Sequence, residues 1–102
     1  RTPFERSETL SAVIGAQLYL KFENQQFTAS FKERGALNRL LDLGPDERSR
    51  GVIAMSAGNH AQGVAVSAKA HEIAATIVMP VTTPSIKVRS VKAQGGKYVD
   101  VV

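Results

Sequence analysis

The chain has 102 residues, of which 43% are hydrophobic, so it forms at most one small domain with a packed core. No apolar run approaches the roughly 20 residues that span a bilayer, no signal-peptide pattern follows the N-terminus, and the absence of cysteine excludes disulfides and cysteine-ligated metals, so we expect a cytoplasmic protein. The formal net charge is +4, but the basic residues are scattered, and their one cluster, Lys87, Arg89 and Lys92, has no aromatic residues interleaved, which argues against a nucleic-acid partner.

The first predicted elements are a strand and a helix. Residues 16–23 alternate apolar and polar side chains, as a half-buried strand does. Ser30 is followed three positions later by Glu33, the capping-box pattern that starts a helix, and leucines follow at helical spacing. Gly44–Pro45 end this helix. We therefore expect Lys32 in the first turn of the helix.

Three further strands and two further helices follow in alternation. The apolar runs at 51–55 and 75–79 predict buried strands, and residues 97–102 predict a third. Helices are predicted between these strands, over 59–70 and 85–94. Such alternation is typical of an α/β fold with a parallel or mostly parallel sheet and flanking helices, joined by right-handed crossovers.

Two short segments carry candidate chemistry. The positive field at a helix start is unfavourable for an ordinary surface lysine. An amine at this position, such as that of Lys32, could instead capture an aldehyde. The turn Ser56–His60 joins a strand to a helix, where outward-pointing amides bind carboxylates or phosphates. Gly58 lets the backbone approach such a ligand closely. Each segment alone has an ordinary explanation: an exposed lysine, and a turn capped by Asn59.

Neither a metal site nor a nucleophile elbow is indicated. The two histidines, His60 and His71, have no further ligands at metal-binding spacing. A serine–histidine–aspartate arrangement stays open, although the sequence contains no elbow motif for it. We expect His60 to pack or to form hydrogen bonds, and His71 to interact with the dipole at a helix C-terminus.

Taken in this order, the two segments closely resemble the serine/threonine dehydratase family of pyridoxal-phosphate enzymes. This family, which includes threonine ammonia-lyases and serine racemases, has the tryptophan-synthase-β-like fold, also called fold type II. The resemblance implies that residues 1–50 belong to the large cofactor-binding domain and residues 51–102 to an incomplete small domain. The matching residues run through nearly the whole chain and include Arg1–Pro3, Leu20–Asn24, Gln26, Ser30–Lys32, Arg34–Ala36, Ser56–Ala65, Ile77–Pro80 and Lys87.

The resemblance also implies a role for each site residue. Lys32 would bind pyridoxal 5'-phosphate covalently and later remove the α-proton of the substrate. Phe31 would pack beside the cofactor ring, and Asn59 would hydrogen-bond the phenolic oxygen of the cofactor. Main-chain amides at Ser56, Gly58, Asn59 and His60 would bind the substrate carboxylate. The implied reaction is β-elimination of water from L-threonine or L-serine to give a 2-oxo acid and ammonia, in a homo-oligomeric parent protein.

Departures from the family pattern refine these expectations. Serine racemases usually carry an acid/base serine where this chain has Ala57, so we expect elimination without efficient racemisation. Ala29 and Glu72 stand where the family commonly has glycine, which implies strain if their backbones are left-handed. The family's glycine-rich phosphate loop is not found and Gly95–Gly96 cannot replace it, so we expect an N-terminal fragment with part of an active site. Alternatives are another enzyme of this fold, such as a threonine synthase, or a catalytically incompetent fragment.

Overall fold

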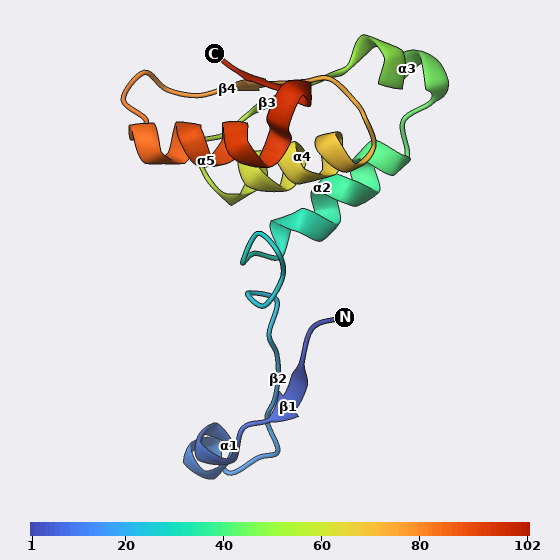
Figure 1. The fold of residues 1–102 in the computed structure, drawn as a ribbon. Helices are drawn as coiled ribbons and strands as arrows, with labels where there is room; N and C mark the ends of the chain where they lie inside the picture. Colours follow the sequence, from blue (N-terminus) through green and yellow to red (C-terminus); the bar gives the residue numbers. More distant parts are fainter. The chain divides into compact units, whose positions relative to one another are not determined.

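The computed structural model describes residues 1–102, which divide into two compact units (Figure 1). The first unit is Arg1–Phe31 and the second is Lys32–Val102. Each unit has its own sheet, antiparallel in the first and parallel in the second. None of the helices combines the length and the apolar character needed to cross a bilayer.

The first unit is built on a short antiparallel pair of strands. Strands β1 (Phe4–Arg6) and β2 (Tyr19–Lys21) pair in antiparallel register, and helix α1 (Glu8–Ile14) connects them. Only β2 falls within the strand predicted at 16–23, and it does not join the parallel sheet. The pattern missed α1, although its signals are present. The hydroxyl of Ser7 accepts from the first turn of the helix, and Gly15 ends the helix.

A polar cluster around Glu23 fixes the loop that follows β2. The Thr2 hydroxyl donates to the Glu23 carboxylate at 2.7 Å, and the Lys21 ammonium pairs with the same carboxylate. The Gln26 side-chain amide also donates to Glu23, at 2.7 Å. These contacts tie the N-terminal segment, β2 and the loop into one unit.

The second unit opens with two helices. Helix α2 (Lys32–Leu41) begins at Lys32, so the predicted placement of this lysine in the first turn is confirmed. Helix α3 (Pro45–Arg50) follows, and the sequence pattern did not predict it. Two signals mark its start: proline at its first position, and the Gly44 N–H, which donates to the Glu47 carboxylate at 2.9 Å.

A three-stranded parallel sheet forms the rest of this unit, in the order β3-β4-β5. The predicted α/β alternation is therefore confirmed. Helix α4 ends at the predicted residue, and the last strand is shorter than predicted because a 3-10 turn precedes it. The bounds are β3 (Val52–Met55), α4 (Asn59–Ala70), β4 (Ala75–Val78), α5 (Ser85–Gly95), η1 (Gly96–Tyr98) and β5 (Val99–Val101).

Only one face of this sheet is covered in the chain, contrary to the prediction of buried strands. Ile77 is fully buried beneath the helices, whereas Ile53 and Met55 on the opposite face are 78% and 82% exposed. The strand order advances in one direction, and two right-handed crossovers in the same direction place both helices on the same side. Figure 1 shows α4 and α5 together on that side.

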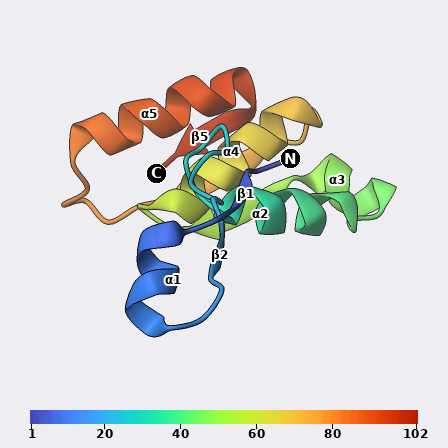
Figure 2. The same cartoon turned by 90° about the horizontal axis from the view of Figure 1, so that it is seen from below.

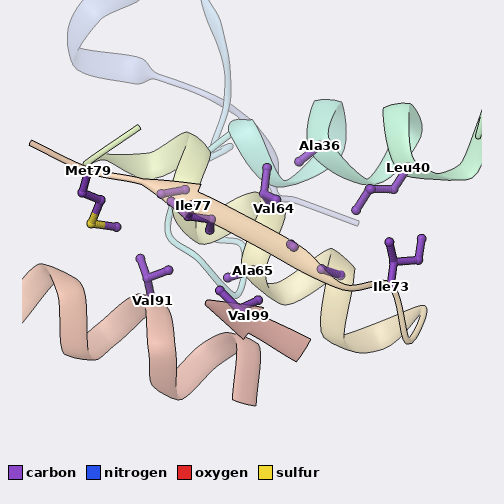
Figure 3. Packing of buried hydrophobic residues seen from close by; sticks show 12 residues of the cluster. Ala36, Leu40, Val64, Ala65, Ile73, Ile77, Met79, Val91 and Val99 are labelled. Carbon is purple, nitrogen blue, oxygen red and sulfur yellow. The ribbon is translucent and has the colours of Figure 1, made fainter. Parts of the chain in front are cut away.

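Helix α4 is the centre of the core. It contacts the sheet, α2 and α5, and Figure 2 shows it between the other two helices. Ala61, Ala65 and Ala68 are fully buried, and such small side chains allow close packing on several sides. Val64 lies on the side of α4 that faces α2, near Leu40 (Figure 3).

The end of α4 confirms an expectation of backbone strain. Glu72 has a left-handed backbone with φ of 55°, and Ala29 has φ of 54°. The Ile73 N–H donates to the Ala68 carbonyl at 2.9 Å and the Glu72 N–H to the Lys69 carbonyl at 3.3 Å, which is the Schellman pattern. Glycine normally occupies the position that Glu72 holds here.

The substitution Glu72→Gly should therefore stabilise the chain. Relief of the left-handed strain is worth about 1 kcal/mol, and loss of the exposed hydrogen bond from the Tyr98 hydroxyl to Glu72 offsets about half of it. We expect a higher urea midpoint at an unchanged slope. The control Tyr98→Phe removes only the hydrogen bond and should lower the midpoint slightly. A Glu72→Gly variant less stable than Tyr98→Phe would contradict this account.

Candidate functional site

The reactive lysine candidate lies at the free end of a helix. Lys32 is the first residue of α2, and its side chain is exposed at the surface of the second unit. Phe31 precedes it directly in the chain, belongs to the first unit, and is 62% exposed. Lys32 therefore lies exposed in the first turn of a helix, where the sequence pattern placed it.

The turn after β3 is shaped by Ser56. Its N–H donates to the Val78 carbonyl at 3.1 Å, which extends the pairing of β3 and β4 beyond the last strand residue. Its hydroxyl accepts from the Gly58 N–H at 3.2 Å. The Ser56 side chain thus holds the backbone in the turn that leads from the sheet into α4.

The N-terminus of α4 presents main-chain amides. The first hydrogen bond of the helix runs from the Gln62 N–H to the Gly58 carbonyl at 3.4 Å, so the amides of Asn59, His60 and Ala61 have no acceptor within the helix. The first turn contains no acidic side chain to offset the helix dipole. This end of α4 therefore has the donors and the electrostatic sign that bind a carboxylate.

The structure brings Lys32 and Asn59 to the same side of α4. Gly63 contacts the first turn of α2 so closely that a Cβ atom on it would lie 3.1 Å from the Lys32 carbonyl oxygen. Asn59 precedes Gly63 by four positions, and residues at this spacing share one face of a helix. Lys32 and Asn59 therefore belong to adjoining helices, α2 and α4, which lie side by side (Figure 2).

His60 lies beside a separate cavity. It lines a cavity of about 300 Å³ between α2, β3 and α4, together with Arg39 and mainly apolar residues. Neither Lys32 nor Asn59 lines this cavity. The predicted contribution of His60 to carboxylate binding therefore rests on its main-chain amide. No group of three or more metal-ligating side chains is gathered in the structure.

Gly63 lies within the segment 56–65 that resembles the family, but the sequence predicted no role for it. Glycine within a helix costs stability relative to alanine, and a close backbone approach is a usual reason for it. Gly63 follows Gln62 in the middle of an otherwise alanine-rich helix, which is the signal that could have indicated the contact. Only the fold shows that the element approaching Gly63 is the first turn of α2.

Comparison with known proteins gives consistent matches over the whole chain. The family model described as "Pyridoxal-phosphate dependent enzyme" matches residues 1–102. The L-threonine ammonia-lyase of Thermotoga maritima is 50% identical over 99 residues, which are 97% of this chain and 25% of that protein. The catabolic L-threonine dehydratase of Staphylococcus aureus is 49% identical over 100 residues, 97% of this chain and 29% of that protein.

Solved structures agree with the sequence matches. The processed form of threonine deaminase isoform 2 from Solanum lycopersicum matches with a TM-score of 0.88 and 46% sequence identity. The match covers 99% of this chain and 28% of the deaminase chain. Maize serine racemase matches with a TM-score of 0.86 and 40% sequence identity, and this match covers 98% of this chain and 30% of the racemase chain. The chain thus spans between a quarter and a third of the length of these relatives.

Removal of the Ser56 hydroxyl should loosen the turn before α4. In Ser56→Ala the Gly58 N–H loses its acceptor, so we expect its hydrogen exchange to accelerate roughly three- to tenfold, as loss of one hydrogen bond implies. Ser56→Thr keeps the hydroxyl and is the matched control. NMR exchange rates measure the effect, and equal rates at Gly58 in Ser56→Ala and wild type would show that the hydroxyl does not hold the turn.

Proposed function

The chain belongs to the family of pyridoxal-phosphate-dependent enzymes, and we propose that it supplies the reactive lysine and the carboxylate-binding turn of an L-threonine or L-serine ammonia-lyase. The observation that carries this proposal is the packing of the first turn of α2 on the face of α4 that bears Asn59. The threonine ammonia-lyase and dehydratase relatives support the choice of substrate.

The donor set fits the cofactor. Lys32 would provide the amine for the aldehyde carbon, from the first turn of α2. The Asn59 carboxamide provides an N–H for the phenolic oxygen, from the adjoining helix. Phe31, next to the lysine, is the residue we assign to the cofactor ring. When bound, the cofactor supplies an electron sink for the reacting carbon.

The residues of the chain would then divide the work of elimination. The N-terminal amides of α4, with those of Ser56 and Gly58, would hold the substrate carboxylate and so orient the α-carbon. The Lys32 amine would accept the α-proton. Hydroxide would leave the β-carbon as water, with one proton that balances the α-proton accepted by Lys32, and hydrolysis of the released enamine would give the 2-oxo acid and ammonia. The elimination releases one water molecule and the hydrolysis consumes one, so no water is consumed overall.

Several further features form part of the proposal. Residues 1–50 are assigned to a larger domain and 51–102 to a smaller one, although contacts within the chain divide it after Phe31. We also assign the protein to the cytoplasm, in keeping with the absence of cysteine, and to a homo-oligomer with a small amino-acid substrate. A threonine synthase-like activity is the alternative within the family.

Covalent capture of the cofactor tests the role of Lys32. The purified chain is mixed with pyridoxal phosphate, reduced with borohydride and digested, and modified lysines are identified by mass spectrometry. We expect preferential modification of Lys32, lost in Lys32→Ala and retained in Lys92→Ala, a control lysine on α5. Modification spread evenly over all lysines would show that the chain does not select the cofactor at Lys32.

Elimination without racemisation is the second expected outcome. A chimera in which this chain replaces the matched segment of the Thermotoga maritima enzyme supplies the remaining residues of an intact relative. We expect 2-oxo acid and ammonia from L-threonine or L-serine, and at least about tenfold less D-serine than 2-oxo acid, because Ala57 has no group to transfer a proton. Chiral chromatography measures D-serine. The variant Ala57→Ser should raise it, and abundant D-serine without that change would contradict the proposal.

A further inference from the structure

At Gly63, helix α4 lies very close to the first turn of α2. A Cβ atom at this position would lie 3.1 Å from the Lys32 carbonyl oxygen and 3.3 Å from both the Cα and the N atom of Glu33. All three distances are shorter than ordinary van der Waals contact, and all three atoms are main-chain atoms that cannot rotate away. Only glycine at position 63 lets the first turn of α2 lie at its present distance from α4.

Backbone conformation does not explain this glycine. Gly63 lies inside α4 and is not among the glycines with positive φ, which are Gly15, Gly51 and Gly96. Glycine inside a helix costs about 1 kcal/mol relative to alanine. Gly35 in α2 provides a comparison, since a Cβ there would meet nothing within 4 Å. The close approach to Lys32 is therefore what distinguishes Gly63.

The contact acts on the lysine main chain rather than on its side chain. Lys32 is the first residue of α2, so any displacement of this turn moves the origin of its side chain directly. Farther along α2, Ala36 and Leu40 share the core with Val64, which anchors the rest of the helix. A Cβ at position 63 would then tilt or shift the lysine end of α2 by a few tenths of an ångström relative to Asn59.

We propose that Gly63 is a positioning residue for Lys32: the absence of its side chain sets the spacing between the lysine and Asn59 across the two helices. The proposal deepens the function inferred above and rests on Lys32 being the residue that captures the cofactor. It assigns Gly63 no contact with the cofactor or the substrate.

The test compares three variants of the chain. Gly63→Ala introduces the contact, Gly35→Ala makes the same chemical change where space is free, and Val91→Ala weakens the core away from Lys32. The first readout needs no cofactor: NMR amide shifts of Lys32 and Glu33 should change in Gly63→Ala, beyond the changes seen in the two controls. Unchanged shifts would overturn the proposal, because the first turn of α2 would then not have moved.

The second readout is selectivity of cofactor capture. In Gly63→Ala the rate of borohydride-trapped modification at Lys32, relative to Lys69 and Lys92 of the same sample, should fall about tenfold, since small misplacements of a reacting group cost that much. Gly35→Ala and Val91→Ala should keep the wild-type ratio. A wild-type ratio in Gly63→Ala would overturn the proposal while leaving Lys32 as the capture site.

The two proposals fail in different ways. If wild type itself shows no preference for Lys32, the proposed function fails for the isolated chain, and the same variants are then compared in the Thermotoga chimera by capture at Lys32 and by kcat. Equal capture and equal kcat in the chimera with and without Gly63→Ala would overturn the positioning role. A Gly63→Ala chain that does not fold, judged by circular dichroism, would also overturn it, because Gly63 would then serve the fold as a whole.

Discussion

The arrangement of the second unit depends on how closely α4 can be approached from its several sides. Its buried residues are small, so the sheet, α2 and α5 all pack on one helix without steric conflict. Wherever α4 lacks side-chain volume, a neighbour takes the space, and the neighbour at Gly63 is the turn that carries Lys32. The same packing that builds the core therefore also determines where the candidate site residues lie.

Local sequence signals predicted the elements that have strong periodicity or punctuation. The alternation of strands and helices from residue 51 onward, the extent of α4 and the position of Lys32 in the first turn of α2 all followed from such signals. The elements β1, α1 and α3 were missed because each is very short and has weak periodicity. Their caps were visible in the sequence, but caps alone do not distinguish a one- or two-turn helix from a turn.

Non-local features set the limit of prediction. Apolar runs at β3 and β4 indicated burial, yet the sequence could not show that both crossover helices would cover the same face of the sheet. The same limit applies to the candidate site. Its residue types and their local settings were predicted, whereas the approach of α2 to α4 and the position of His60 beside a separate cavity required the three-dimensional packing.

The uncovered face of the parallel sheet has a consequence for the behaviour of the chain in solution. Ile53 and Met55 stand on it side by side with the half-buried Val78, and β3 also forms an edge of the sheet. An apolar face next to unpaired main-chain groups favours association between copies. The net charge of +4 opposes such association by repulsion, and salt screens that repulsion. The colloidal stability of the chain should therefore fall as ionic strength rises.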